Sequence, residues 1–207
     1  GIYYPTAGDM FLNRPGSNKK KSLKGLKPNQ VTIHGLARTF QNIRLFLQMT
    51  VLENVMIGRH CRTRAFILGA LFRNRKTRIE ERAILEDSYA ILEKVGLQDF
   101  ANEYSKNLPY GAQRRLEIAR ALATEPLLLL LDEPAAGMNP QETLELVDLI
   151  NEISNDGQSI LLIEHDMKLV MSLSQRIFVM DYGSKIAQGT PEEIRNNKDV
   201  IKAYLGE

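Results

Sequence analysis

An acidic pair follows a run of five leucines in the second half of the chain. Leu127 to Leu131 has the apolar character of a buried strand, and Asp132 and Glu133 come directly after it. Such a strand would hold Asp132 at a fixed depth, where its carboxylate suits a Mg²⁺ ion that keeps much of its water. Glu133 could accept a proton from an attacking water. The alternative is that the pair only ends a strand and caps the turn before Pro134.

Two further polar residues stand at the ends of apolar runs. Gln41 follows Leu36 to Phe40, and its neutral amide could orient a metal-bound water and a nucleophilic water. His165 lies two residues beyond Ser159 to Ile163, which makes it a candidate contact for the γ-phosphate of a nucleotide. A single histidine is more often a structural residue, so neither position indicates chemistry without the others.

A helix is predicted just upstream of the leucine run, with its N-terminus at Gly111. Leu116, Ala119 and Ala123 give this helix a packing face of mostly small residues. A helix N-terminus with a glycine allows a phosphate to approach exposed backbone N–H groups, although a plain helix start would look similar. The residues at this start are Leu108, Pro109, Tyr110, Gly111 and Ala112.

Apolar runs alternate with helical patterns in the second half of the chain. The runs end in polar residues at Asp132, Glu164 and Asp181. This alternation predicts a parallel sheet covered by helices, with the polar residues gathered at the carboxyl ends of the strands. A helix is predicted from Pro140 to Gly157, with one buried face formed by Leu146, Ile150 and Ile153.

The first half of the chain predicts edge structure followed by a helical block. Turn residues dominate Gly1 to Leu26, and a short helix is predicted over Pro28 to His34. From Thr50 to Gly96 the pattern is helical, which indicates a small subdomain. One helix there has a predicted buried face formed by Leu85, Tyr89 and Leu92.

An apolar segment with basic ends lies inside this helical block. Phe66 to Phe72 follows Arg62 and Arg64 and precedes Arg73. Such a segment can lie as a helix against a membrane surface or a partner protein. The alternative is a small helix that packs inside its own subdomain.

The composition narrows the class of protein. The 207 residues are 43% hydrophobic and 25% charged, which suits one substantial core with a small subdomain. With 27 basic and 25 acidic side chains, the charge does not indicate a nucleic-acid-binding protein. The single Cys61 cannot form an internal disulfide, which favours a reducing, cytosolic compartment. No apolar run reaches the ~18 residues that a membrane-spanning helix requires.

Taken in order, these motifs resemble the sequence elements of ABC ATPases. The matches are Gln41 to the Q-loop, Leu108 to Gly111 to the signature, Leu127 to Glu133 to Walker B, Ala136 to Asn139 to the D-loop, and His165 to the H-loop. Several segments resemble more narrowly the ATP-binding subunit of branched-chain amino-acid importers. They are Ala37 to Gln41, Asn107 to Arg115, Asp132 to Pro140, Leu162 to Met167 and Ala203 to Glu207.

The resemblance implies a role for each polar motif residue. Asp132 would hold Mg²⁺ through water, and Glu133 would be the general base that activates water for attack on ATP. His165 would contact the γ-phosphate. Gln41 would take part in the metal site, sense the nucleotide and couple it to the membrane subunit.

The resemblance also implies partners. Two ATPase subunits, identical or paralogous, would face head to tail, so that Leu108 to Ala112 closes over ATP held by the other subunit and Asn139 bridges the two sites. Membrane permease subunits would dock on the pair, and a periplasmic or extracellular amino-acid-binding protein would act through them. The subunit would lie at the cytoplasmic face of the cell membrane, and no nucleic acid is expected.

Three features depart from the family pattern. No G-x-x-x-x-G-K-[ST] phosphate-binding loop (Walker A) occurs. In the family this loop lies before the residues that match Gly1, so we interpret the chain as N-terminally truncated and expect it to bind ATP poorly by itself. Ala112 stands where the signature usually has a glutamine. The segment from Arg14 to Gly25 is longer than the usual turn.

Together these patterns predict an α/β fold: an incomplete P-loop NTPase core with a mainly parallel sheet and a helical subdomain. The predicted boundaries are 1–49 for part of the core with the Q-loop, 50–107 for the helical subdomain, and 108–207 for the rest of the core. The predicted function is ATP hydrolysis that powers an importer. The alternatives are an ABC ATPase of another transport or soluble system, and a non-catalytic basic module that binds nucleic acid or anionic lipid through Lys19 to Lys27 and Arg59 to Arg82.

Overall fold

The computed structural model describes residues 3–14, 16, 20–62 and 75–205. The segment predicted at 66–72 lies outside the described residues. The chain divides into two compact units, Gly1–Leu161 and Leu162–Glu207. Within the described ranges, no helix combines the length and the apolar character that crossing a membrane requires.

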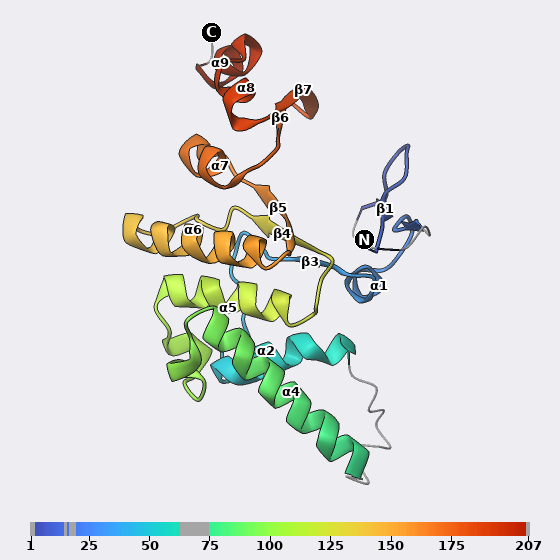
Figure 1. Ribbon diagram of the computed structural model, residues 1–207, viewed down its shortest axis with the longest axis vertical. Coiled ribbons are helices and arrows are strands. Elements are labelled where there is room, and N and C mark those ends of the chain that lie inside the picture. The colour runs from blue at the N-terminus through green and yellow to red at the C-terminus, as the bar shows by residue number, and fades with distance from the viewer. Residues whose placement is uncertain (1–2, 15, 17–19, 63–74, 206–207) are drawn as a thin grey trace. The chain divides into compact units, whose positions relative to one another are not determined.

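The first unit holds short strands and a group of packed helices (Figure 1). β1 (Phe11–Leu12) and β2 (Lys21–Ser22) pair with each other in an antiparallel ribbon. The elements in chain order are β1 (Phe11–Leu12), β2 (Lys21–Ser22), α1 (Pro28–Ile33), β3 (Leu36–Arg38), α2 (Val51–Arg59), η1 (His60–Arg62), α4 (Arg75–Lys94), η2 (Gln98–Phe100), η3 (Ser105–Asn107), α5 (Tyr110–Leu122), β4 (Leu128–Asp132), α6 (Pro140–Asn155) and β5 (Ser159–Ile163).

The sheet that carries the motif residues has the order β3-β4-β5. β3 and β4 are parallel, with Arg38 opposite Leu130. Gly35, which precedes β3, has a φ of +105°, and a Cβ atom there would lie 2.8 Å from the Leu127 side chain. Only glycine fits this approach, which sets the start of β3 beside the start of β4.

β3 is shorter than predicted. We expected a strand over 36–40, but β3 ends at Arg38. Thr39 still donates its backbone N–H to Leu130 O at 3.0 Å, whereas the N–H of Phe40 donates to the Glu117 carboxylate at 3.4 Å. The chain therefore leaves the sheet just before Gln41, because a side chain on α5 replaces the strand as acceptor.

Helix α5 packs as the sequence predicts. Leu116, Ala119 and Ala123 are fully buried, which confirms the predicted face. α5 contacts both α2 and α4. Gly58 of α2 lies against the backbone carbonyl of Arg120, where a side chain would clash. The small residues at this crossing bring α2 and α5 close together and fix the position of α5.

The buried face of α4 differs from the predicted one. Leu92 is fully buried, but Leu85 and Tyr89 are 44% and 41% exposed. Ser88, one turn before Leu92, is fully buried instead. α4 contacts α2 and α5, and the small Ser88 side chain permits a closer helix approach than the ring of Tyr89 would. The prediction was wrong because apolar spacing alone does not reveal a buried serine.

Helix α6 confirms its predicted face and has a well-defined start. Leu146, Ile150 and Ile153 are all almost fully buried. At the N-terminus, Asn139 Oδ1 accepts from the N–H of Glu142 at 2.9 Å, and the N–H of Asn139 donates to the Glu142 carboxylate at 2.9 Å. This reciprocal capping box satisfies backbone donors that the helix leaves unpaired. It fixes the end of the segment that follows β4.

The second unit is built around a two-stranded hairpin. Its elements are α7 (Met167–Leu173), β6 (Ile177–Asp181), β7 (Ser184–Gly189), α8 (Pro191–Arg195) and α9 (Lys198–Leu205). Tyr182 and Gly183 join β6 to β7 with φ values of +42° and +79°, as in the tight turns of antiparallel hairpins. We predicted that 177–180 belongs to the parallel sheet, which is wrong because this turn returns the chain directly against β6. The core residues are Ile177, Ala187, Ile194 and Val200.

Candidate functional site

The Gln41 and Glu133 side chains meet where the chain leaves β3 and β4. Gln41 Nε2 donates to Glu133 Oε2 at 2.6 Å, although the two residues are 92 positions apart. Glu133 has a φ of +45°, a left-handed conformation that is uncommon for a residue with a side chain. Strained backbone of this kind clusters at functional sites. The structure thus brings together two of the residues that the sequence singled out.

Asp132 lies at the end of β4 and pairs with Arg38 at the end of β3. Arg38 Nη2 is 2.6 Å from Asp132 Oδ2. The N–H of Asp132 donates to Thr39 Oγ1 at 3.3 Å, which fixes the backbone at the end of the strand. Sequence reasoning missed Arg38. The available signal was its place in a predicted strand that would lie beside the leucine run.

The donor atoms at this edge of the sheet fit Mg²⁺. Asp132 offers a carboxylate and Gln41 offers an amide oxygen, and Mg²⁺ prefers oxygen ligands while keeping several of its waters. The parts of the chain that the structure describes hold no group of three or more His, Cys, Asp or Glu side chains suited to a metal ion. A magnesium ion that is shared with phosphate groups does not need such a group.

The residues predicted to face the ATP of a second subunit lie at the start of α5. Leu108 is buried and Pro109 precedes the first turn. A Cβ atom on Gly111 would lie 2.8 Å from Glu142 Oε1, so a larger residue there would displace the Glu142 carboxylate that caps α6. Ala112 is buried as well. Most of this segment therefore packs inside its own unit.

Tyr110 connects the start of α5 to the segment that follows Glu133. Its hydroxyl donates to Ala136 O at 2.9 Å and accepts from Arg114 Nη2 at 3.0 Å. Gly137 has a φ of +79°, and a Cβ atom there would lie 3.3 Å from the Tyr110 ring. The predicted signature and D-loop segments are thus in direct contact within one chain.

Sequence reasoning also missed two buried charged residues on α5. Arg114 and Glu117 are 0% and 1% exposed. Burial raises the pKa of Glu117, while hydrogen bonds from the backbone of Phe40 and Arg44 and the nearby guanidinium groups oppose that rise. The available signal was two opposite charges at i, i+3 spacing among the apolar positions of the predicted helix.

Asn139 and His165 are the remaining predicted site residues. Asn139 belongs to the first unit and uses its side chain to cap α6. His165 belongs to the second unit, just before α7; its side chain is 80% exposed, with Nδ1 3.9 Å from Glu164 Oε2. The contact of His165 with a phosphate and the bridging role of Asn139 stay predictions.

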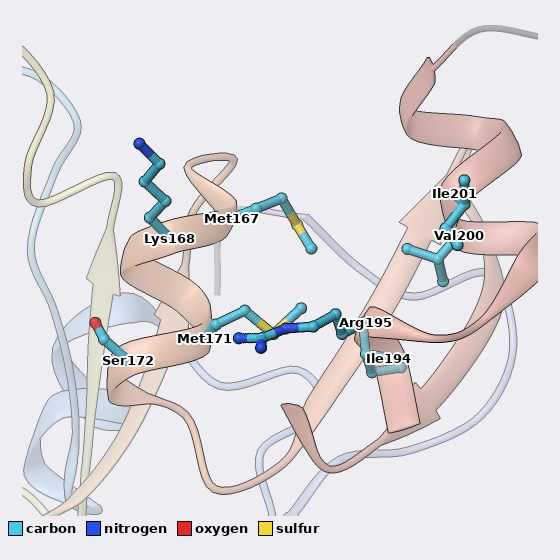
Figure 2. Close-up of a pocket in the computed structure, with 8 residues that line it drawn as sticks. All are labelled: Met167, Lys168, Met171, Ser172, Ile194, Arg195, Val200 and Ile201. Atoms are coloured by element: carbon cyan, nitrogen blue, oxygen red, sulfur yellow. The ribbon is translucent and has the colours of Figure 1, made fainter. Parts of the chain in front are cut away.

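Two hollows lie away from the Gln41–Glu133 contact. One, of about 730 Å³, is in the first unit and has Arg38 and Glu117 in its wall. The other, of about 600 Å³, is in the second unit, where α7 faces α8 and α9 across an apolar space (Figure 2). Neither hollow is lined by Gln41, Asp132 or Glu133.

Comparisons with known proteins show the family of this chain. Residues 1–136 match the family described as ABC transporter, and residues 184–207 match the branched-chain amino acid ATP-binding cassette transporter family. The chain is 48% identical to the high-affinity branched-chain amino acid transport ATP-binding protein LivG of Salmonella typhimurium, over 100% of this chain and 79% of that protein. It is 47% identical, over the same shares, to the protein BraF of Pseudomonas aeruginosa, which has the same description.

Solved structures share the fold. An ATP-binding cassette of an ABC transporter in its ADP conformation, MJ1267, aligns with a TM-score of 0.72 at 28% identity, over 90% of this chain and 74% of that one. A nucleotide-free ATP-binding cassette aligns with a TM-score of 0.72 at 30% identity, over 92% and 79%. The family match and its relatives define a transport-coupled ATPase of the cassette class. The solved structures confirm the predicted α/β fold. The chain belongs to the ABC transporter family.

Proposed function

We propose that this chain is the ATPase subunit of an importer for branched-chain amino acids. The observation that carries the ATPase part of the proposal is the Gln41–Glu133 contact, because it sets an amide against a carboxylate at the end of a buried strand. Its relatives LivG and BraF are named for branched-chain amino acid transport. The match of residues 184–207 to the cassette family of the same name supports the same substrate class.

In this proposal Glu133 is the general base and Gln41 orients the attacking water. Glu133 can accept a proton from water when that water attacks the γ-phosphate of ATP, and the Gln41 amide restricts where the water lies. His165 contacts the γ-phosphate. Asp132 and Gln41 would hold Mg²⁺, which neutralises phosphate charge when bound.

The proposed assembly contains two ATPase subunits and a membrane permease. The signature segment, Leu108 to Ala112, closes over ATP held by the second subunit, and Asn139 lies near the junction. Residues 50–107 form the helical subdomain between the core segments 1–49 and 108–207. This subdomain and the segment at Gln41 dock on the permease. The protein is therefore peripheral to the membrane, on its cytoplasmic face. It acts with the amino-acid-binding protein only through the permease.

The test of the substrate class is uptake into vesicles that contain the binding protein and the assembled transporter, with an ATPase subunit that also carries a Walker A loop. We expect ATP-dependent uptake of leucine, isoleucine and valine and none of lysine or glutamate. The same vesicles with Glu133→Gln should take up none of the five. Uptake of another solute in place of leucine would contradict the substrate class but leave the ATPase in place.

A further inference from the structure

Arg114 is a fully buried charged residue whose hydrogen bonds go mainly to backbone atoms. Its two terminal nitrogens donate to the carbonyl oxygens of Phe40 and Gln41, each at 2.9 Å. Its ion pair with Glu117 is longer, at 3.6 Å. Burying a guanidinium group is costly unless hydrogen bonds compensate it. Here the compensating hydrogen bonds hold the backbone on which the Gln41 side chain is carried.

Glu117 holds the same segment from the same helix. Its Oε1 atom accepts from the backbone N–H groups of Phe40 and Arg44, both at 3.4 Å. Arg114 therefore satisfies carbonyl groups and Glu117 satisfies N–H groups of one short loop. A loop held through both kinds of backbone group has little freedom to shift.

A second set of contacts leads from Arg114 to the other side of the site. Arg114 Nη2 also donates to the Tyr110 hydroxyl, and that hydroxyl donates to Ala136 O. Ala136 comes three residues after Glu133. One guanidinium group thus touches the Gln41 loop directly and reaches the chain beyond Glu133 through a single tyrosine.

We propose that Arg114 is a positioning residue for ATP hydrolysis, which keeps the Gln41 amide against the Glu133 carboxylate by holding the backbone of both segments. Gln41 is exposed, so packing does not fix its side chain, and a displacement of about 1 Å at a reacting group can cost about 10²-fold in rate. The proposal rests on the proposed roles of Gln41 and Glu133.

The competing explanation is that Arg114 only stabilises the fold. The buried contacts of Arg114 and Glu117 are not optimal for stability. Arg114 Nε and Glu117 Oε2 are buried and have no hydrogen-bond partner among the described residues, and an unsatisfied buried polar atom costs stability. A purely structural role would also act independently of Gln41. A positioning role would not, since removing the Gln41 amide leaves nothing for Arg114 to position.

The test is a double-mutant cycle in the assembled, purified transporter, with an ATPase subunit that also carries a Walker A loop. Arg114→Met, Gln41→Ala and the double variant are compared by kcat and KM for ATP. We expect Arg114→Met to lower kcat about tenfold or more and to change KM less than about threefold. In the Gln41→Ala background the further loss should shrink to about twofold or less. An equal loss in both backgrounds, or a raised KM with unchanged kcat, would overturn the proposal.

Two variants complete the test. Arg115→Met is the matched control, because the Arg115 guanidinium lies beside Gly96, and it should keep wild-type kcat. Arg114→Lys keeps the charge with fewer hydrogen-bond donors, so it should give an intermediate kcat that also depends on Gln41. This variant replaces Arg114→Met in the cycle if Arg114→Met does not fold. Full kcat in the lysine variant would overturn the proposal. Turnover by Glu133→Gln would instead contradict the proposed function.

Discussion

Gln41 Nε2 donates a hydrogen bond to Glu133 Oε2 at 2.6 Å, between a loop that leaves β3 and the residue that follows β4. The contact links two segments of the chain that only the fold brings together. Any nucleotide-dependent shift of the Gln41 loop would move the amide relative to the carboxylate. A change in the position of the Gln41 loop can therefore alter the proposed general base, and the reverse. Coupling of ATP hydrolysis to a permease requires such a reciprocal effect.

In an ATPase subunit that also carries a Walker A loop, Glu133→Gln should abolish turnover and leave ATP binding nearly intact. Glutamine keeps the size and the hydrogen bonding but cannot take the proton of water, and loss of a general base typically costs ~10²- to 10⁴-fold in rate. Single-turnover hydrolysis and nucleotide-binding titration of the assembled transporter would measure both effects. Glu145→Gln, an exposed position on α6, is the control. Near-normal hydrolysis would remove Glu133 from the role of base.

Asp132→Asn should weaken Mg²⁺-dependent ATP binding rather than the chemical step alone. A neutral amide is a weaker magnesium ligand than a carboxylate, so about tenfold more Mg²⁺ should be needed for half-maximal ATP binding. A titration of ATP binding with Mg²⁺ would measure this, with Asp148→Asn on the exposed surface of α6 as the control. An unchanged Mg²⁺ requirement with lost hydrolysis would assign Asp132 a different role.

Leu92→Ala and Leu85→Ala should differ in their effect on the free energy of unfolding. Leu92 is fully buried, so its truncation should cost about 2–5 kcal/mol. Leu85 is 44% exposed, so its truncation should cost less than about 1 kcal/mol. Urea unfolding of the two variants checks which face of α4 packs in solution. Equal costs would mean that Leu85 is buried in solution, as the apolar spacing predicted.

Glu117→Gln should change how stability depends on pH. Burial raises the pKa of Glu117, so the folded chain binds the proton more tightly than the unfolded chain does. The stability that this proton confers is present below the ordinary carboxyl pKa and is lost as pH rises through the raised value. Relative to Glu117→Gln, the wild type should therefore lose unfolding free energy across that window.

The measurement is the unfolding free energy of both proteins at a series of acidic and neutral pH values. A constant difference would show that the pKa of Glu117 is not shifted. If the wild type instead gained unfolding free energy relative to Glu117→Gln as pH rises, the ion pairs with Arg114 and Arg120 would outweigh burial and lower the pKa of Glu117.

Cysteines placed at Asn42 and Leu47 should cross-link to the permease. Both residues are exposed in the loop that carries Gln41, which we propose as part of the docking surface. The experiment uses a Cys61→Ser background, and a cysteine at Leu144, exposed on α6, is the control. If the Leu144 cysteine cross-links under some nucleotide condition and neither loop cysteine ever does, the docking surface lies elsewhere.

The sequence by itself predicted the candidate site residues, and it determined which faces of two helices are buried. Acidic residues after a leucine run identify a strand end, and helical spacing identified the buried faces of α5 and α6, for example at Leu116 and Ile150. These predictions succeed because they depend on local periodicity and on the order of motifs. Both can be determined from the linear sequence alone.

Only the tertiary structure decided what those residues touch. The contact of Gln41 with Glu133, and the burial of Arg114 against the Gln41 backbone, join segments more than 70 positions apart. The burial of Ser88 instead of Tyr89 and the antiparallel pairing of β6 likewise depend on neighbouring elements. A charged or polar side chain is buried only where the fold supplies its partners, and those partners lie far away in the sequence.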